Sequence, residues 1–232
     1  MPKNKIHNSH KSEIPTSVGL KVCGMKYNTQ EVAALQPDYL GFIFYEKSPR
    51  NFDGEIQILP KNIKKVGVFV DATIAFAKAQ IEKYNLDIIQ LHGSESPEYI
   101  KDLIRVLIDS SETWPEIWKV FSIKDSFDFK RLTPYKDHVS AFLFDTKGKA
   151  KGGNGYTFDW NVLKDYPFKK PFILSGGIGL EEIDNIKEIL ATDLPILALD
   201  VNSKFEDRPG QKNIENLTTF TSQLASLLER RD

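Results

Sequence analysis

Short apolar runs recur along the whole chain, and more polar stretches separate them. They occupy Leu20 to Cys23, Tyr39 to Phe44, Lys65 to Val70, Ile88 to Leu91, Trp118 to Ile123, Ala141 to Asp145, Pro171 to Leu174 and Ile196 to Val201. Most are nearly continuous in Val, Ile, Leu and Phe, without strict alternation. This pattern is typical of parallel strands that are buried on both faces.

The segments between these runs carry signals for helices. Asn28 to Glu31 can form a capping box, Ser96 and Pro97 supply an N-cap and a first-turn proline, and Glu181 with Glu182 places negative charge at a helix start. One face of the stretch after Pro97 collects Ile100, Leu103, Ile104 and Leu107. Strand and helix units repeated over about 215 residues favour an α/β fold, a single (β/α)₈ TIM barrel. An open doubly wound sheet is the alternative.

Domain boundaries follow from the polarity of the N-terminus. Residues 1–17 are polar, so we expect a short flexible N-terminal arm, followed by one catalytic barrel domain over residues 18–232. His7 and His10 lie in this arm without an accompanying carboxylate or thiol cluster, so the sequence predicts no metal site.

Composition narrows the classes of partner. The formal net charge of the 232 residues is -1, and no basic tract indicates nucleic-acid binding. No apolar run is long enough for a membrane span, and the only cysteine cannot form an intrachain disulfide. We therefore expect a cytoplasmic protein that acts on a small molecule, either as a monomer or as a homodimer.

In such a barrel, chemistry lies on the loops that follow the strands. The residues at these strand ends are Cys23, Arg50, Asp71, His92, Asp145, Ser175 to Gly177, and Asp200 to Ser203. They include groups that transfer protons and groups that bind anions. The strand ends therefore predict one active site assembled from many parts of the chain.

Cys23 and Asp145 are the candidates for proton transfer. A lone cysteine is often only a small buried apolar residue, but Cys23 is at the predicted catalytic rim. Asp145 closes an apolar run, and burial there would raise its carboxyl pKa and allow a protonated acid near neutral pH. A helix cap or a salt bridge is the structural alternative for Asp145.

Arg50 and His92 are candidates for binding substrate. Arg50 follows Pro49 and can hold a carboxylate through two hydrogen bonds, or it is a solvated loop residue. His92 orients substrate, or it satisfies a hydrogen bond in the core. We expect Asp71 to cap the next helix.

Two loops late in the chain suit a phosphate. Gly176 and Gly177 follow the seventh strand, and Asn202 with Ser203 follows the eighth. Backbone N–H groups near a helix start favour an anion, and barrels of this kind often hold phosphate here. The glycine- and lysine-rich loop over residues 147–155 is predicted to form a lid.

These residues, taken in order, resemble one family. The segments are Lys21 to Gly24, Gly41 to Phe44, Ser48 to Arg50, Gln90 to Gly93, Phe144 to Thr146, Gly152 to Gly155, Ser175 to Gly177 and Leu199 to Val201. Together they closely resemble phosphoribosylanthranilate isomerase, a (β/α)₈ barrel without cofactor. The resemblance implies the third step of tryptophan biosynthesis from chorismate, an Amadori rearrangement of N-(5'-phosphoribosyl)anthranilate.

The resemblance also implies roles for individual residues. Cys23 corresponds to the general base, Asp145 to the general acid, and Arg50 to the contact with the anthranilate carboxylate. The phosphate would lie over strands seven and eight. Asn154 and Lys204 depart from the family pattern, in the lid and in the phosphate loop respectively.

The first strand predicts a buried charge beneath the site. Because side chains alternate along a strand, Lys21 faces the same side as Cys23. A buried ammonium needs a partner, and Asp200 at the end of the neighbouring strand is the nearest candidate. We therefore predict an ion pair between Lys21 and Asp200, with Lys21 also favouring the Cys23 thiolate.

Other functions fit the sequence less well. Indole-glycerol-phosphate synthase would need a lysine and a glutamate at particular strand ends, and an epimerase would need metal ligands or two facing aspartates. An inactivated barrel that only binds a phosphate ligand would have lost the acid or the base, whereas Cys23 and Asp145 are both present.

Overall fold

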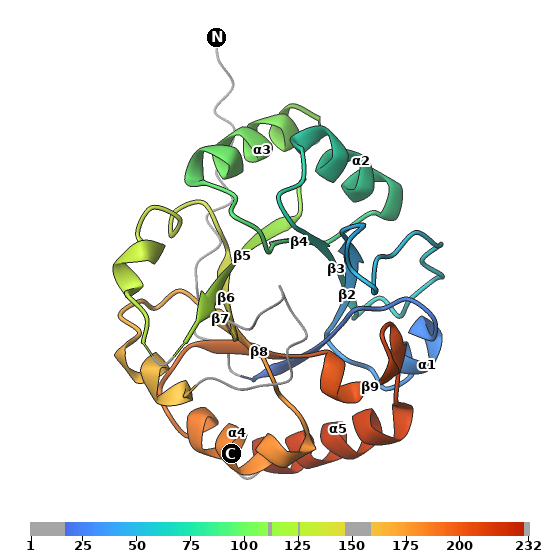
Figure 1. The fold of residues 1–232 in the computed structure, drawn as a ribbon, viewed down its shortest axis with the longest axis vertical. Coiled ribbons are helices and arrows are strands. Elements are labelled where there is room, and N and C mark those ends of the chain that lie inside the picture. Colours follow the sequence, from blue (N-terminus) through green and yellow to red (C-terminus); the bar gives the residue numbers. More distant parts are fainter. Residues whose placement is uncertain (1–16, 111–112, 125, 147–158, 230–232) are drawn as a thin grey trace.

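Eight parallel strands close into a barrel in chain order (Figure 1). The computed structural model describes residues 17–110, 113–124, 126–146 and 159–229. The strands are β1 (Gly19–Cys23), β2 (Tyr39–Phe44), β3 (Lys64–Phe69), β4 (Ile88–Leu91), β5 (Glu116–Ile123), β6 (Ala141–Thr146), β7 (Phe172–Ser175) and β8 (Ile196–Val201). The pairing of β1 with β8 completes the ring, so the predicted barrel is confirmed and the open sheet is wrong.

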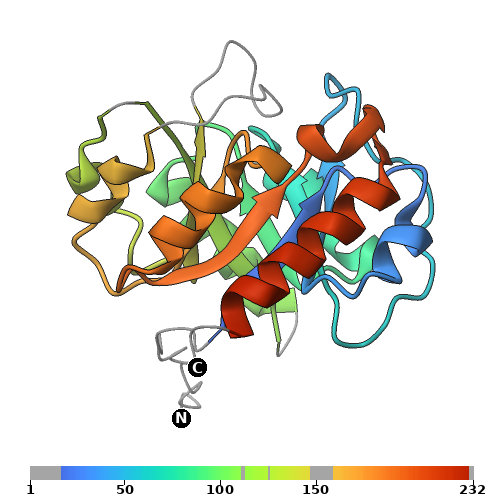
Figure 2. The same ribbon diagram turned by 90° about the horizontal axis from the view of Figure 1, so that it is seen from below.

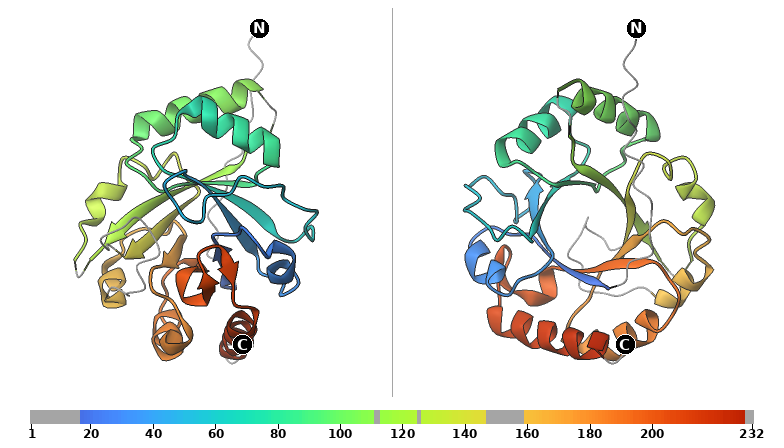
Figure 3. Two further views of the ribbon diagram at one scale, coloured as in Figure 1. Left: turned by 45° about the vertical axis from the view of Figure 1, so that its right-hand side comes forward. Right: turned by 180° about the vertical axis from the view of Figure 1, so that it is seen from behind.

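Helices surround this ring (Figures 1 and 3). The α-helices are α1 (Thr29–Ala33), α2 (Ile74–Tyr84), α3 (Pro97–Ser110), α4 (Ile183–Leu190) and α5 (Ile214–Leu228). The 3₁₀ helices are η1 (Phe129–Leu132), η2 (Trp160–Asp165), η3 (Leu180–Glu182) and η4 (Ser203–Phe205). None of the described helices is long and apolar enough to cross a membrane.

The connection between β2 and β3 departs from the predicted repeat of strand and helix. Residues 45–63 are all described, and they contain no helix. Pro49, Gly54 and Pro60 lie within this segment, and proline and glycine are poor residues for a helix interior.

Two of the predicted helix caps are wrong, and one is confirmed. The Ser96 hydroxyl accepts a backbone N–H in the first turn of α3, as expected. Asn28 precedes α1 but makes no side-chain cap, because its amide group binds the backbone of Lys212. Asp71 does not cap α2, since the side chain of Thr73 fills that position.

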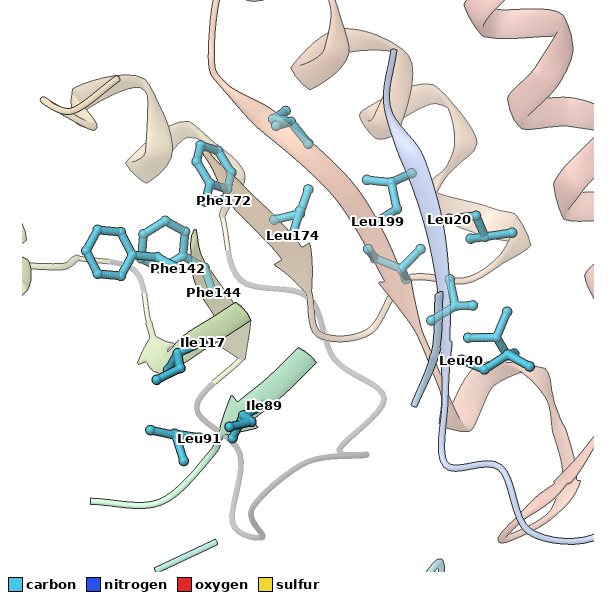
Figure 4. Close-up of a cluster of buried hydrophobic side chains, with 14 of the residues drawn as sticks. Leu20, Leu40, Ile89, Leu91, Ile117, Phe142, Phe144, Phe172, Leu174 and Leu199 are labelled. Atoms are coloured by element: carbon cyan, nitrogen blue, oxygen red, sulfur yellow. The ribbon is translucent and has the colours of Figure 1, made fainter. Parts of the chain in front are cut away.

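The apolar core has two layers, one on each face of the closed sheet. Outward-facing residues pack between the strands and the helices, as Figure 4 shows for Leu20, Leu40, Ile89, Leu91, Ile117, Phe142, Phe144, Phe172, Leu174 and Leu199. A smaller cluster fills the barrel interior with Val66, Ile88, Trp118, Val120, Ala141, Leu143, Ile173 and Ala198. The interior is therefore packed below the strand ends.

A short hairpin follows β8 and was not predicted. It consists of β9 (Glu206–Arg208) and β10 (Gln211–Lys212), which pair antiparallel. Gly210, in the turn, has a φ of 85°, a value that glycine adopts without steric cost. Figure 2 shows this hairpin and η4 at the end of the barrel toward which β8 runs. The hairpin therefore adds side chains to the end where we expect the active site.

Candidate active site

One cavity at the carboxyl ends of the strands collects every predicted site residue. Its lining includes Cys23, Arg50, His92, Asp145, Gly176, Gly177, Asp200, Asn202 and Ser203. These residues come from loops and strand ends spread over the chain from β1 to η4. A closed parallel sheet brings them together because all of its strands end on the same side.

The predicted ion pair lies in the barrel interior directly below this cavity. Lys21 on β1 is opposite Asp200 on β8 in the strand register, and its Nζ is 2.8 Å from Asp200 Oδ1. The Lys21 side chain has no exposed surface. Burial acts to lower the pKa of Lys21, but the charges of Asp200 and Cys23 and the hydrogen bonds to them together outweigh it and raise the pKa above its usual value. Lys21 therefore keeps its positive charge beneath the site.

Cys23 lies above Lys21 and fits closely against β2. The register pairs Cys23 with Gly41, and a Cβ atom on Gly41 would be only 2.8 Å from the Cys23 Sγ. Only glycine leaves room for the sulfur in its present place. The backbone of β2 thus fixes the position of the thiol.

The ionisation of Cys23 depends on burial as well as on the charges around it. Burial raises the pKa of the thiol, while the ammonium groups of Lys21 and Lys212 oppose that shift without cancelling it. The predicted influence of Lys21, which favours the thiolate, is confirmed in sign, although burial has the larger effect on the thiol pKa. Loss of hydration outweighs the nearby positive charge.

Asp145 lies on β6 and contacts His92, which follows β4, and Ser175 at the end of β7. Its Oδ2 is 3.4 Å from His92 Nε2, and its Oδ1 accepts the Ser175 hydroxyl at 3.4 Å. His92 Nδ1 in turn lies 3.3 Å from Gln90 Nε2. The carboxyl group therefore faces the cavity with an imidazole and a hydroxyl beside it.

Arg50 lines the cavity but already has a carboxylate partner within the chain. Its Nε lies 3.0 and 2.9 Å from the two carboxylate oxygens of Glu206, and its Nη2 is 2.6 Å from Oε2. Glu206 was not predicted from the sequence. Arg50 is therefore a fixed residue of the cavity wall and not a solvated loop arginine.

Lys212 is the second residue that the sequence analysis missed. Its side chain is fully buried, and its Nζ lies 2.8 Å from Glu206 Oε1 and 2.7 Å from Asn202 Oδ1. Burial lowers the pKa of Lys212 to about 8. The turn-forming pair Pro209 and Gly210, flanked by charged residues, was the signal in the sequence that could have indicated this hairpin.

The two predicted phosphate loops border the same cavity. Gly176 and Gly177 have φ angles of 93° and 72°, in the left-handed region that favours glycine. Asn202 and Ser203 lead into η4 on the other side. Lys204, one of the departures from the family pattern, pairs with Glu181 at 2.6 Å. The predicted lid, with Asn154, lies outside the described residues, as does the N-terminal arm up to residue 16.

The cavity contains groups that can act on protons and on anions. Among the described residues, no group of three His, Cys, Asp or Glu side chains is arranged to hold a metal ion. What the cavity offers is a thiol, a carboxyl group and an imidazole, together with paired cations. Such a set suits acid-base chemistry on an anionic small molecule.

Comparison with known sequences gives one consistent family. The family model for N-(5'-phosphoribosyl)anthranilate isomerase matches residues 20–223. A protein of that name from Parabacteroides distasonis is 40% identical over 217 residues, which cover 88% of this chain and 92% of the relative. Another from a Thermoanaerobacter species is 34% identical over 218 residues, covering 90% and 99%.

Comparison with solved structures agrees. The crystal structure of phosphoribosyl anthranilate isomerase from Thermus thermophilus superimposes with a TM-score of 0.75 at 28% identity, covering 90% of this chain and 100% of that one. The Thermotoga maritima enzyme superimposes with a TM-score of 0.73 at 26% identity, with the same coverage. Sequence, fold and the contents of the cavity thus agree: the chain belongs to the N-(5'-phosphoribosyl)anthranilate isomerase family.

Proposed function

We propose that this isomerase uses Cys23 as general base and Asp145 as general acid in an Amadori rearrangement. The reaction converts N-(5'-phosphoribosyl)anthranilate to 1-(o-carboxyphenylamino)-1-deoxyribulose 5-phosphate. The observation that carries the proposal is that a thiol from β1 and a carboxyl group from β6 line the same cavity. In the closed sheet, strands β7 and β8 lie between β6 and β1.

The chemistry requires two proton transfers of opposite direction. Asp145 gives a proton to the furanose ring oxygen as C1' becomes an iminium and the ring opens. Cys23 then removes the proton from C2', which gives an enolamine that tautomerises to the ketone. His92, 3.4 Å from the Asp145 carboxyl group, lies where it can orient that acid or the sugar.

The remaining polar groups suit the two ends of the substrate. Gly176, Gly177, Asn202 and Ser203 surround the part of the cavity over β7 and β8, which suits the phosphate. Arg50, beyond β2, suits the anthranilate carboxylate. Asp200, held by Lys21, forms the floor beneath the ribose.

The wider setting follows from the same chemistry. We place the reaction third in tryptophan biosynthesis from chorismate, in the cytoplasm, with a monomer or a homodimer as the working unit. The barrel over residues 18–232 is the catalytic domain, and residues 1–17 form its arm. A barrel that only binds phosphate is not favoured, because it gives no reason for a base and an acid in one cavity.

The test is turnover of freshly formed phosphoribosylanthranilate, followed by the loss of its fluorescence. We expect Cys23→Ala and Asp145→Asn each to lower kcat by roughly 10²- to 10⁴-fold, the usual contribution of general acid-base catalysis. Asp102→Asn, on the exposed face of α3, is the matched control and keeps full turnover.

Arg50→Ala tests the binding role and is expected mainly to raise KM. Wild-type decay no faster than the spontaneous background would overturn the activity. Unchanged kcat in both Cys23→Ala and Asp145→Asn would overturn the assignment of acid and base.

A further inference from the structure

The guanidinium of Arg50 is held along one edge by the protein itself. Glu206 accepts from Nε at 3.0 and 2.9 Å and from Nη2 at 2.6 Å, which is the two-point geometry that fixes the plane of an arginine. The side chains are 13% and 3% exposed. An arginine carries five N–H bonds, so its outer edge, formed by Nη1 and the second Nη2 hydrogen, keeps its donors.

Glu206 is held in turn by groups of the hairpin. Its Oε1 accepts from Lys212 Nζ at 2.8 Å and from the Gly210 backbone N–H at 3.0 Å. Although burial acts in the opposite direction, the hydrogen bonds from Arg50 and Lys212 hold the pKa of Glu206 below its usual range. The carboxylate is therefore charged and has little freedom to turn.

Lys212 joins this cluster to two other parts of the chain. Its ammonium group lies 2.7 Å from Asn202 Oδ1, in the loop predicted to bind phosphate. Its backbone is fixed by the side chain of Asn28, which donates at 2.9 Å and accepts at 3.0 Å. Hydrogen bonds therefore hold Lys212 both at its backbone and at its ammonium group.

The charges of the cluster explain why a glutamate beside Arg50 does not abolish anion binding. Arg50 and Glu206 alone would form a neutral pair with little attraction for a carboxylate. Lys212 adds one positive charge, so the three side chains together keep a single net positive charge next to the cavity. Gly24 allows this arrangement, because a Cβ there would be 2.9 Å from Arg50 Cδ and 2.7 Å from Asn202 Oδ1.

We propose that Glu206 and Lys212 are positioning residues that aim the outer edge of Arg50 at the substrate carboxylate and keep that corner of the cavity positively charged. This inference rests on the proposed function. It adds that recognition of the carboxylate depends on a hairpin after β8, more than 150 residues along the chain from Arg50, as the sequence separation of 156 shows.

The experiment compares two stable probes that differ only in the carboxylate. One is the reduced product, 1-(o-carboxyphenylamino)-1-deoxyribitol 5-phosphate, and the other carries a plain phenyl ring. Dissociation constants are measured by calorimetry for the wild type, for Glu206→Gln and for Lys212→Met. Glu82→Gln and Lys78→Met, which replace an exposed pair on α2, are the matched controls.

We expect each test variant to weaken binding of the carboxylate probe by about tenfold, the size of one charge-assisted hydrogen bond, and to change binding of the phenyl probe by less than about twofold. The sign for Glu206→Gln is informative. Removing a negative charge would by itself strengthen anion binding, so weaker binding reports lost orientation of Arg50.

Several outcomes would overturn the inference. They are tighter or unchanged binding of the carboxylate probe to Glu206→Gln, or equal weakening of both probes in the two test variants. If Lys212→Met does not fold, the isosteric Glu206→Gln alone decides. If the wild type is active and the test variants bind both probes as the wild type does, only this inference is refuted. If the wild type is inactive, the proposed function is refuted.

Discussion

The two sides of the cavity are built differently. On the side of the base, Lys21 with Asp200 and Arg50 with Glu206 form ion pairs of 2.8 and 2.6 Å between largely buried groups. On the side of the acid, the contacts of His92 and Ser175 with Asp145 are both 3.4 Å. Catalytic hydrogen bonds in ligand-free sites are often long and tighten when substrate binds. Of the contacts that join described residues, the ion pairs on the base side are shorter than the contacts that His92 and Ser175 make on the acid side.

The largest effect should come from breaking the ion pair on the base side. Lys21→Met leaves Asp200 buried without its partner, and we expect a loss of about 3–5 kcal/mol in the free energy of unfolding. Urea denaturation measures it. The control is Lys64→Met, because Lys64 forms an exposed pair with Glu116 and its side chain is 50% exposed. That change should cost no more than about 1 kcal/mol. Equal losses would contradict the comparison.

Displacing the sulfur should have the next largest effect. Gly41→Ala puts a methyl group only 2.8 Å from Cys23 Sγ, so the sulfur must move. We expect kcat to fall on the order of 10²-fold, since misplacement by about 1 Å is enough for such a loss. Gly54→Ala is the control, because its nearest neighbour would be 3.7 Å away, an ordinary contact. Full kcat in Gly41→Ala would show that the sulfur tolerates displacement.

The ionisation of Cys23 sharpens the comparison through pH. Because burial raises the pKa of the thiol, its thiolate forms above the ordinary value of about 8.5. A base must be deprotonated, so kcat/KM should rise with pH into that range. Cys23 is the only cysteine, so the rate of alkylation by iodoacetamide reports its ionisation directly. If the alkylation rate stops rising at a pH below the ordinary thiol pKa, the pKa of Cys23 is not raised and the prediction is wrong.

The smallest effect on stability is expected on the acid side. His92→Asn removes only contacts of 3.3 and 3.4 Å, and we expect a loss of no more than about 1 kcal/mol in the free energy of unfolding. The measurement is the same urea titration as for Lys21→Met. A cost similar to that of Lys21→Met would contradict the expected difference in stability between the two changes.

The strand pattern predicted the barrel and its catalytic end because both depend on periodicity and on strand order. The order of the strands places Cys23 and Asp145 in one cavity and Lys21 beside Asp200. The hairpin residues did not, since a strand of two or three residues has no periodicity to detect.

Errors at individual residues have a common physical cause. Asn28 has the side chain of a helix cap, but a contact 184 positions along the chain uses it instead. For Cys23 the sequence indicated the nearby positive charge but not how completely water is excluded, and that exclusion raises the thiol pKa. In both cases tertiary packing overrode a local preference.

The packed interior of the barrel has a consequence for how substrate enters and product leaves. Lys21 and Asp200, with Trp118 edge-on to Tyr39 at a centroid distance of 5.1 Å, occupy the axis beneath the reacting groups. These side chains close the cavity at its lower end. Ketose made at the bottom must leave through the mouth by which the next aldose arrives, so each blocks the other, and accumulated product should slow turnover in simple competition.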